Sequence, residues 1–272
     1  MIELFEYAKE VGNSAANNLY ILKKEVSPHI IKSKEDSSPL FNFDLLTDKF
    51  ICSKLIKTGF QVVSEESYKK GQILKSEYWL IDPIDGSKEF NSKKGKMTIN
   101  ISFIKNNYPV FGIINVINTS NYSSQQYTGF VKSDFQYQKL KHEIKKPLKN
   151  IRLITSLYHL NESDRKFIKT NKYDLISKCS SAYKFVKVAH SKDDIYVRFE
   201  GSSEWDTAAG QAIIESNKGK VICLKTLNRL KYSKPFLRNT AFVAVRKGIE
   251  IVDFNIKSLK IELYESNNFS CR

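Results

Sequence analysis

The stretch Trp79-Leu80-Ile81-Asp82-Pro83-Ile84-Asp85-Gly86-Ser87 carries the pattern on which the interpretation of this chain rests. An apolar run leads two carboxylates, separated by two residues, to the carboxyl end of a predicted strand, where ligand sites of open α/β sheets collect. Pro83 fixes one backbone angle, and Gly86 allows a tight turn close to an anion. Clustered carboxylates repel one another unless cations neutralise them, and hard oxygen donors favour Mg²⁺ over zinc. The stretch therefore predicts a magnesium site that recruits a substrate phosphate.

Three further acidic clusters have chemistry consistent with the same site. They are Asp44-Leu45-Leu46-Thr47-Asp48, Ser64-Glu65-Glu66-Ser67 and Glu204-Trp205-Asp206-Thr207-Ala208-Ala209-Gly210. Each cluster alone has a structural alternative, such as a helix N-cap at Asp206 or a plain turn at Asp85-Gly86. The strand-to-turn context of residues 79–87 favours the functional interpretation.

Length and composition set the broad class. The 272 residues suffice for one large domain or two lobes, and 41% hydrophobic with 27% charged residues is typical of a soluble globular protein. No apolar run approaches the roughly 18 residues of a membrane span, and the acidic N-terminus does not resemble a secretory signal. The four cysteines are far apart without a C-x-x-C pair, which favours reduced thiols in a cytoplasmic protein.

The net charge of +15 has two interpretations. It could steer a polyanionic substrate or nucleic acid, or it could reflect heavy use of lysine on a solvated surface. The lysines are spread along the chain, and the lysine-rich segment 138–149 has no interleaved aromatic residues, which disfavours nucleic-acid binding. That segment is the best candidate boundary. It predicts an N-terminal lobe over residues 1–150, a C-terminal lobe over 151–247 and an extension of unassigned role over 248–272.

Apolar periodicity predicts the elements. Spacings of three and four indicate helices over residues 2–24 and about 43–58, the second closed by Gly59 and preceded by a loop or short hairpin over 26–42. We expect strands at residues 60–63, 78–81, 99–104, 110–116, 153–155, 195–199, 221–224 and 241–245, and a further helix at residues 206–216. Helices and strands mixed through both halves indicate a layered α/β architecture.

The motifs together resemble a known family. D-P-I/L-D-G-S/T, with an upstream E-E and a downstream W-D-x-A-A-G, is the signature of the inositol monophosphatase-like phosphatases, which are Mg²⁺-dependent and Li⁺-sensitive. All three motifs occur here in the family's order and at about its spacing, over residues 1 to about 247. The resemblance implies the family's α/β/α/β/α sandwich, with the active site between the lobes.

Within that family, several segments are similar to the CysQ branch, the 3′(2′),5′-bisphosphate nucleotidases. They are Lys34-Glu35-Asp36-Ser37-Ser38-Pro39, Asp85-Gly86-Ser87-Lys88-Glu89-Phe90, Ser180-Ser181-Ala182-Tyr183-Lys184-Phe185 and residues 205–210. The branch implies hydrolysis of the 3′-phosphate of adenosine 3′,5′-bisphosphate to AMP and phosphate, a reaction of sulfur metabolism, by a cytoplasmic monomer or homodimer. The alternatives are an inositol monophosphatase or another small sugar phosphatase and, in a different class, a catalytically silent relative that binds nucleic acid.

The resemblance also assigns the metal ligands, for two or three Mg²⁺ ions. They are Glu65, Asp82, the backbone carbonyl of Ile84, Asp85 and Asp206. Asp82 takes the bridging role, with Glu65 on one metal and Asp85 and Asp206 on the other. Two divalent ions about 3.5–4 Å apart can polarise a phosphate, activate a water and stabilise the leaving oxygen. The intact set of carboxylates argues against a silent relative.

Further implied roles concern the water and the phosphate. Asp44 would orient the attacking water together with the hydroxyl of Ser87, which stands where the family has threonine. Backbone N–H groups of Gly86 and Ser87, and a helix beginning near Ser87, would face the phosphate. Lys184 and Arg198 are candidates for holding a second phosphate, with ordinary surface cations as the alternative.

Two departures from the branch stand out. Phe41-Asn42-Phe43 replaces a threonine and a small residue before the catalytic Asp, which removes a hydroxyl near the site. Leu157 stands where a polar or basic residue is common, which weakens the case for the nucleotide substrate.

Overall fold

The first of the two five-stranded sheets that the structure describes contains residues 79–85 in its second strand. The computed structural model describes residues 1–25, 30–33, 39–87, 89, 95–132, 151–157, 160–171, 173 and 175–249. The sheet contains β3 (Gln61–Ser64), β4 (Glu77–Asp85), β5 (Lys96–Lys105), β6 (Tyr108–Asn118) and β7 (Ser124–Phe130), in that spatial order. β3 and β4 are parallel, and the other neighbours are antiparallel. Because side chains alternate along a strand, both faces of this sheet are apolar and buried.

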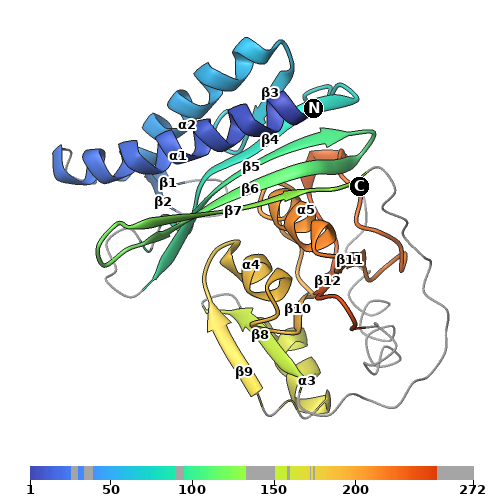
Figure 1. Cartoon of the computed structure of the whole chain (residues 1–272). Helices are drawn as coiled ribbons and strands as arrows, with labels where there is room; N and C mark the ends of the chain where they lie inside the picture. The colour runs from blue at the N-terminus through green and yellow to red at the C-terminus, as the bar shows by residue number, and fades with distance from the viewer. Residues whose placement is uncertain are drawn as a thin grey trace.

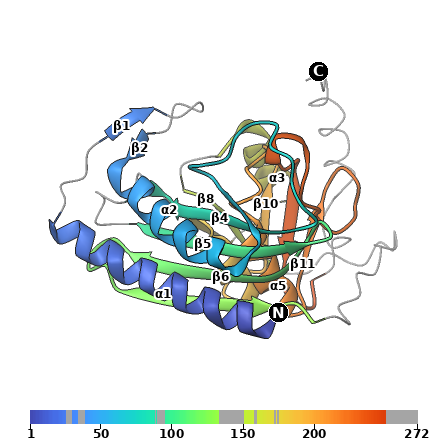
Figure 2. The ribbon, with the colours of Figure 1, turned by 90° about the horizontal axis from the view of Figure 1, so that it is seen from above.

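Two helices, α1 (Ile2–Glu25) and α2 (Asn42–Leu55), cover one face of this sheet (Figure 2). The α1 residues Ala8, Val11, Ala15 and Leu19 recur at helical spacing and are buried against the sheet. A short hairpin of β1 (Ile30–Ser33) and β2 (Pro39–Phe41) links the helices, and a single 3₁₀ turn, η1 (Ile56–Thr58), ends α2 before Gly59. Both helices lie where periodicity predicted them, and the hairpin lies within residues 26–42, where a loop or short hairpin was expected.

The second sheet is formed by the later part of the chain. Its strands lie in the order β11 (Lys220–Cys223), β12 (Phe242–Val245), β10 (Ile195–Arg198), β8 (Arg152–Ser156) and β9 (Leu175–Cys179). β8, β9 and β10 are parallel, whereas β12 runs antiparallel to both of its neighbours. Helix α3 (Glu162–Asn171) packs on the outer face of this sheet through Phe167.

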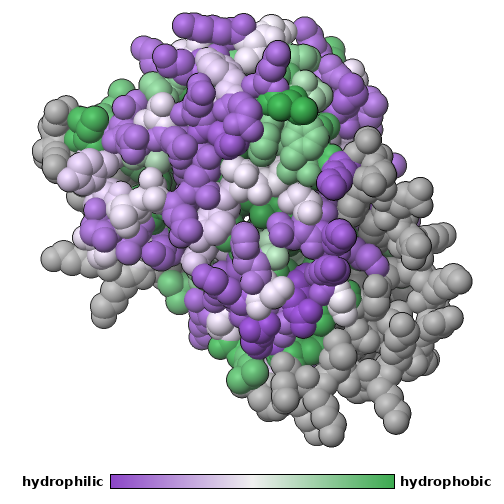
Figure 3. All heavy atoms as spheres, viewed as in Figure 1, coloured by the Kyte–Doolittle hydropathy of each residue, from purple (hydrophilic) through white to green (hydrophobic). Residues whose placement is uncertain are grey.

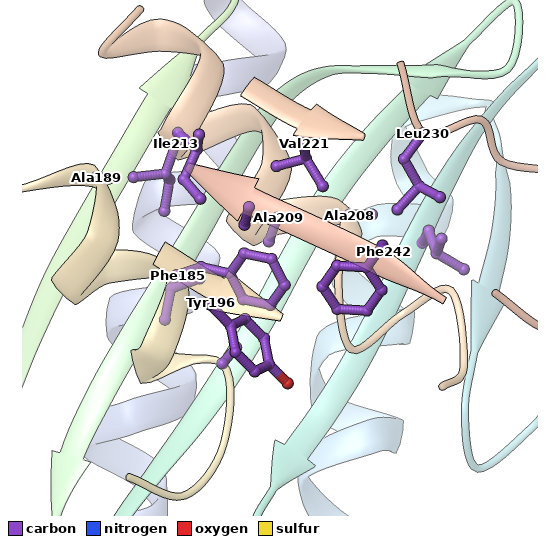
Figure 4. Packing of buried hydrophobic residues seen from close by; sticks show 14 of the residues in the cluster. Phe185, Ala189, Tyr196, Ala208, Ala209, Ile213, Val221, Leu230 and Phe242 are labelled. Atoms are coloured by element: carbon purple, nitrogen blue, oxygen red, sulfur yellow. The ribbon is translucent and has the colours of Figure 1, made fainter. Parts of the chain in front are cut away.

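Between the two sheets lie α4 (Tyr183–Ala189) and α5 (Ala208–Ser216) (Figure 1). Their buried residues share one core with both sheets, in which the rings of Phe185, Tyr196 and Phe242 lie 5.3–5.9 Å apart (Figure 4). The layers therefore run α1/α2, first sheet, α4/α5, second sheet and α3. The expected α/β/α/β/α sandwich is confirmed.

Several elements differ from the predictions. β4 continues to Asp85 instead of ending at residue 81, and β7, α3, β9 and α4 were not predicted. α5 begins at Ala208, so Asp206 and Thr207 precede the helix instead of opening it. The boundary segment 138–149 and most of the extension, residues 250–272, lie outside the described residues. The division into lobes stays a prediction.

The hydrophilic character of the surface is consistent with the high proportion of charged residues in the sequence. The face in Figure 3 is mostly hydrophilic over the described residues. Among the helices that the structure describes, none has the length and apolar character needed to cross a membrane.

Candidate active site

A cavity of about 420 Å³ brings the predicted motifs together. The sequence-predicted site residues that line it are Glu65, Asp82, Ile84, Asp85, Gly86, Ser87, Lys184, Arg198 and Asp206. They come from the ends of β3 and β4 in the first sheet, from α4 and β10, and from the turn before α5. Segments distant in sequence thus contribute to one wall of carboxylates with cations beside it.

A bulge at the end of β4 positions Asp82 and Asp85. Asp82 pairs with Asn100 of β5 and Asp85 with Thr98, so three steps along β4 match two along β5. Such a bulge redirects side chains at a strand end. Gly86 then turns the chain with φ of +89°, and a Cβ there would lie 3.1 Å from the Glu89 carboxylate. The left-handed backbone angle requires the glycine of the motif, and the nearby Glu89 side chain leaves little room for a larger residue.

Hydrogen bonds fix the other two acidic positions. The Glu65 N–H donates to the Ile81 carbonyl at 3.1 Å, which extends the parallel β3–β4 pairing past the end of β3. The Asp206 Oδ2 accepts from the Ser203 N–H at 3.1 Å in the turn before α5. Each carboxylate is therefore attached to a strand end or a braced turn.

Burial and nearby negative charge act against the ionisation of Asp85 and Asp206. Burial raises the pKa of Asp206 to about 7, and the nearby Asp85 and Glu65 add to the increase. Burial likewise raises the pKa of Asp85, while the Lys184 ammonium acts in the opposite direction. Negative charge concentrated in a dry site is stabilised by cations.

The residues present fit a hard divalent cation. Opposite Asp82 and Asp85 on β5, the buried side chains of Asn100 and Thr98 have no hydrogen-bond partner among the described residues. Neither of these two side chains lines the cavity, but the carboxylates of Glu65, Asp82, Asp85 and Asp206 do, and carboxylate oxygens are ligands that Mg²⁺ prefers. Among the described residues, no three His, Cys, Asp or Glu side chains are already grouped closely enough to form a coordination shell.

The two predicted cations are built into the cavity wall. Lys184 is only 6% exposed, and its Nζ donates to the carbonyls of Ser181 at 2.6 Å and Cys179 at 3.5 Å. Arg198 is half-buried, with a hydrogen bond to Tyr196 and electrostatic contact with Asp206 and Asp85. Neither residue is an ordinary surface cation.

Asp44 lies outside the set of residues that line the cavity. Its Oδ2 accepts from the Phe41 N–H at 2.9 Å, so the carboxylate caps the start of α2. Its role in orienting water stays a prediction. The unusual Phe41 and Phe43 stack on each other with ring centroids 5.1 Å apart.

The remaining residues singled out in the sequence do not line the cavity or lie outside the described residues. Leu157 is 39% exposed and does not line the cavity. Lys88, Phe90 and residues 34–38 lie outside the described residues, and so does the greater part of the helix predicted to begin near Ser87.

Several lining residues were missed by the sequence reasoning. The aromatic side chains of Phe185, Tyr196 and Phe242 form part of the wall, and Arg238 lies at the cavity as well. No motif spacing pointed to Arg238, because an isolated backbone bridge between Ser203 and Arg238 brings it there. In the sequence, only the positive charge of Arg238 could have suggested a role in binding an anion, and the chain contains many other lysines and arginines.

Comparison with known proteins agrees with this geometry. Residues 4–247 match the inositol monophosphatase family. The chain belongs to that family. Family membership explains why the D-P-I-D-G-S turn and the W-D-T-A-A-G segment converge in one cavity.

Individual relatives narrow the comparison. The chain is 31% identical over 198 residues to the 3′(2′),5′-bisphosphate nucleotidase CysQ of Buchnera aphidicola, covering 70% of this chain and 73% of that protein. The crystal structure of CysQ from Bacteroides thetaiotaomicron superposes with a TM-score of 0.64 at 25% identity, covering 91% and 97% of the two chains. The 2′AMP-bound SaIMPase-II from Staphylococcus aureus has the same fold, with a TM-score of 0.72, 20% identity and coverage of 98% and 99%. The chain is a phosphatase of the CysQ and inositol monophosphatase kind.

Proposed function

We propose that this chain is a Mg²⁺-dependent 3′(2′),5′-bisphosphate nucleotidase that converts adenosine 3′,5′-bisphosphate to AMP and phosphate. The observation that carries the proposal is one cavity with carboxylates on one wall and the cations Lys184 and Arg198 beside them. Carboxylates suit an ion that binds the scissile phosphate, and cations suit a second anionic group. The CysQ relatives support the nucleotide over a simple sugar phosphate.

The proposed metal ligands are Glu65, Asp82, Asp85, Asp206 and the Ile84 carbonyl. When bound there, Mg²⁺ would polarise the phosphate and stabilise charge on the leaving oxygen. The carboxylates hold their positions through the β4 bulge and through the turn braced by Ser203. The number of ions, two or three, is part of the proposal.

Residues of the β4 turn handle the phosphate and the water. Ser87 lines the cavity. Its hydroxyl would hold the attacking water, and the N–H groups of Gly86 and Ser87 would donate to phosphate oxygens. We assign Asp44 the second contact to that water. The cations Lys184 and Arg198 would orient the remainder of the substrate and offset its charge.

A substrate panel tests the assignment. Phosphate release is measured from adenosine 3′,5′-bisphosphate and from inositol 1-phosphate in parallel, with Mg²⁺, with a chelator, and with Mg²⁺ plus Li⁺. We expect turnover that requires Mg²⁺, is inhibited by Li⁺ and favours the nucleotide. Preference for the inositol ester would contradict the nucleotidase assignment.

An Asp85→Asn variant provides the matched test of mechanism. We expect it to lose activity by more than about 100-fold, because it removes a proposed metal ligand. The control is Glu162→Gln on α3, which removes an exposed carboxylate that does not line the cavity. Equal activity in the two variants would exclude the metal arrangement proposed here. A cytoplasmic location and a monomer or homodimer complete the proposal.

A further inference from the structure

Arg238 is fixed at the cavity by its backbone and its side chain. It pairs with Ser203 in an isolated antiparallel bridge, and its Nη1 donates to the Ser203 hydroxyl at 3.2 Å. Its Nη2 reaches the Gly201 carbonyl at 3.5 Å. The next residue, Asn239, is also tied to this loop, since its N–H donates to the Ser202 carbonyl at 2.7 Å. The guanidinium therefore has a defined position on the wall.

Ser203 links Arg238 to the carboxylate end of the cavity. The Ser203 N–H donates to Asp206 at 3.1 Å, while its hydroxyl accepts from Arg238 at 3.2 Å. Two hydrogen bonds and the covalent bonds within one serine separate the guanidinium from Asp206, a span of at most on the order of 10 Å. One sugar ring with its ester oxygens bridges a similar span. A phosphate on the far side of such a ring would reach Arg238.

Arg238 is also the cation with donors to spare. Lys184 donates to two carbonyls, and Arg198 is engaged with Tyr196 and the acidic wall. Arg238 is exposed, and among the described residues its bonds go only to the neutral groups of Ser203 and Gly201. A guanidinium has five N–H donors, so it can bind a phosphate while keeping these bonds.

We propose that Arg238 is a specificity-determining residue that binds the second phosphate of a bisphosphate substrate. The inference rests on the proposed function, which places the scissile phosphate at Asp82, Asp85 and Asp206. A simpler role is also available to Arg238, that of bracing the loop that carries Asp206. The two roles differ in outcome: a brace affects every substrate, whereas a phosphate contact affects only substrates with a second phosphate.

Two matched substrate pairs separate these roles. The first pair is adenosine 3′,5′-bisphosphate with adenosine 3′-monophosphate, and the second is inositol 1,4-bisphosphate with inositol 1-phosphate. For Arg238→Ala we expect kcat/KM to fall roughly 10- to 100-fold on the bisphosphate of the active pair, as for a lost charge-assisted hydrogen bond. The monophosphate of the same pair should be turned over nearly as by the wild type. Arg238→Lys, which keeps charge but loses the forked geometry, should fall between them.

Controls make each outcome decisive. Arg165→Ala removes an exposed arginine of α3 that does not line the cavity and should leave all four rates unchanged. If Arg238→Ala melts early, Arg238→Gln, which can keep the bond to Ser203, replaces it. Equal losses on both members of a pair, or no loss on either, would overturn the inference. Turnover of only the inositol pair would refute the nucleotidase assignment, while the ratio within that pair would still test Arg238.

Discussion

At the residue scale, the cavity concentrates negative charge where burial opposes it. The pKa values of Asp85 and Asp206 are both raised, chiefly by burial and further by neighbouring carboxylates. A cation that binds only the folded state would relieve this repulsion and stabilise the fold. The site therefore links folding stability to the proposed metal.

The first prediction follows from that linkage. We expect Mg²⁺ to raise the melting temperature of the wild type. Asp85→Asn should raise the melting temperature without metal, because it removes one repelling charge. The variant should also show a smaller increase on addition of Mg²⁺, because it lacks one proposed ligand. Thermal unfolding in chelator and in excess Mg²⁺ measures both effects. A Mg²⁺ increment in the variant as large as in the wild type would contradict the placement of Asp85 at the metal.

A second prediction concerns Asp194, whose carboxylate binds two arginines. It accepts from the Arg152 N–H at 2.8 Å and the Arg152 Nη2 at 2.9 Å, and it also pairs with Arg246. Burial alone would raise the pKa of Asp194, but these hydrogen bonds outweigh it and lower the pKa from 3.8 to about 2. The charged form is therefore favoured by folding, and its contribution is complete above about pH 4 and is lost as the pH falls toward 2.

We expect Asp194→Asn to lower the free energy of unfolding by roughly 2 kcal/mol near neutral pH. The difference between variant and wild type should shrink as the pH is lowered below about 4, because the wild-type carboxyl then takes up its proton. Urea unfolding of both proteins across this pH range measures the difference. A difference that stays constant down to the lowest pH would show that the charge of Asp194 is not what stabilises the fold.

At the element scale, the predictable parts were those with a regular apolar pattern: helical spacing in α1, alternation in β5 and short continuous apolar runs in β6 and β12. The spacing of Ala8, Val11 and Ala15 predicts α1, and the alternation in residues 98–103 predicts β5. β7 was missed because Ser124 and Gln125 lie on an exposed edge strand and give no apolar alternation. α4 was missed because it lies between two sheets with even Lys184 buried, so it has no polar face.

The same reasoning explains what could be foreseen of the site. Asp82 and Asp85 could be identified from the sequence alone, because an apolar strand that ends in charged residues is a recognisable pattern. Arg238 could not, since only the pairing of two distant segments brings it to the cavity. Asp44 is a predicted site residue from the resemblance alone, and the structure shows that its carboxylate caps α2. Motifs can be read locally, whereas contacts between segments require the fold.

The third prediction concerns the packing of α5 on the first sheet. A side chain at Gly112 of β6 would collide with the backbone of Ala209 in α5. We expect Gly112→Ala to lower the free energy of unfolding by about 1–3 kcal/mol and to reduce activity, because α5 must move and Asp206 lies just before it. Denaturant unfolding and phosphate release measure the two effects.

The control for that prediction is Ser124→Ala on β7 of the same sheet, where the side chain is exposed. It should change the free energy of unfolding by no more than about 0.5 kcal/mol. If Gly112→Ala were equally mild, the close contact between β6 and α5 would not hold in solution.

At the scale of the whole molecule, α5 comes from the later half of the sequence but packs against the first sheet, which is formed by the earlier half. The core between the sheets contains Leu80 and Ile114 from the first sheet, Ala209 and Ile213 from α5, and Phe242 from the second. This core is formed only when both halves are present. The cavity has the same property, with Asp82 and Asp85 contributed by one half and Asp206 by the other.

That shared middle layer has a consequence for a chain cut in two. A break between Lys132 and Ile151 would leave Glu65, Asp82 and Asp85 on one fragment and Asp206 on the other, and each fragment would expose an apolar face to water. We expect that neither fragment hydrolyses phosphate esters alone and that activity returns when the two are refolded together. An activity assay of the single and the mixed fragments would detect this fragment complementation. Turnover by either piece alone would contradict this expectation, because it would show that one half suffices. Return of activity only in the mixture would show that each half is catalytically incomplete.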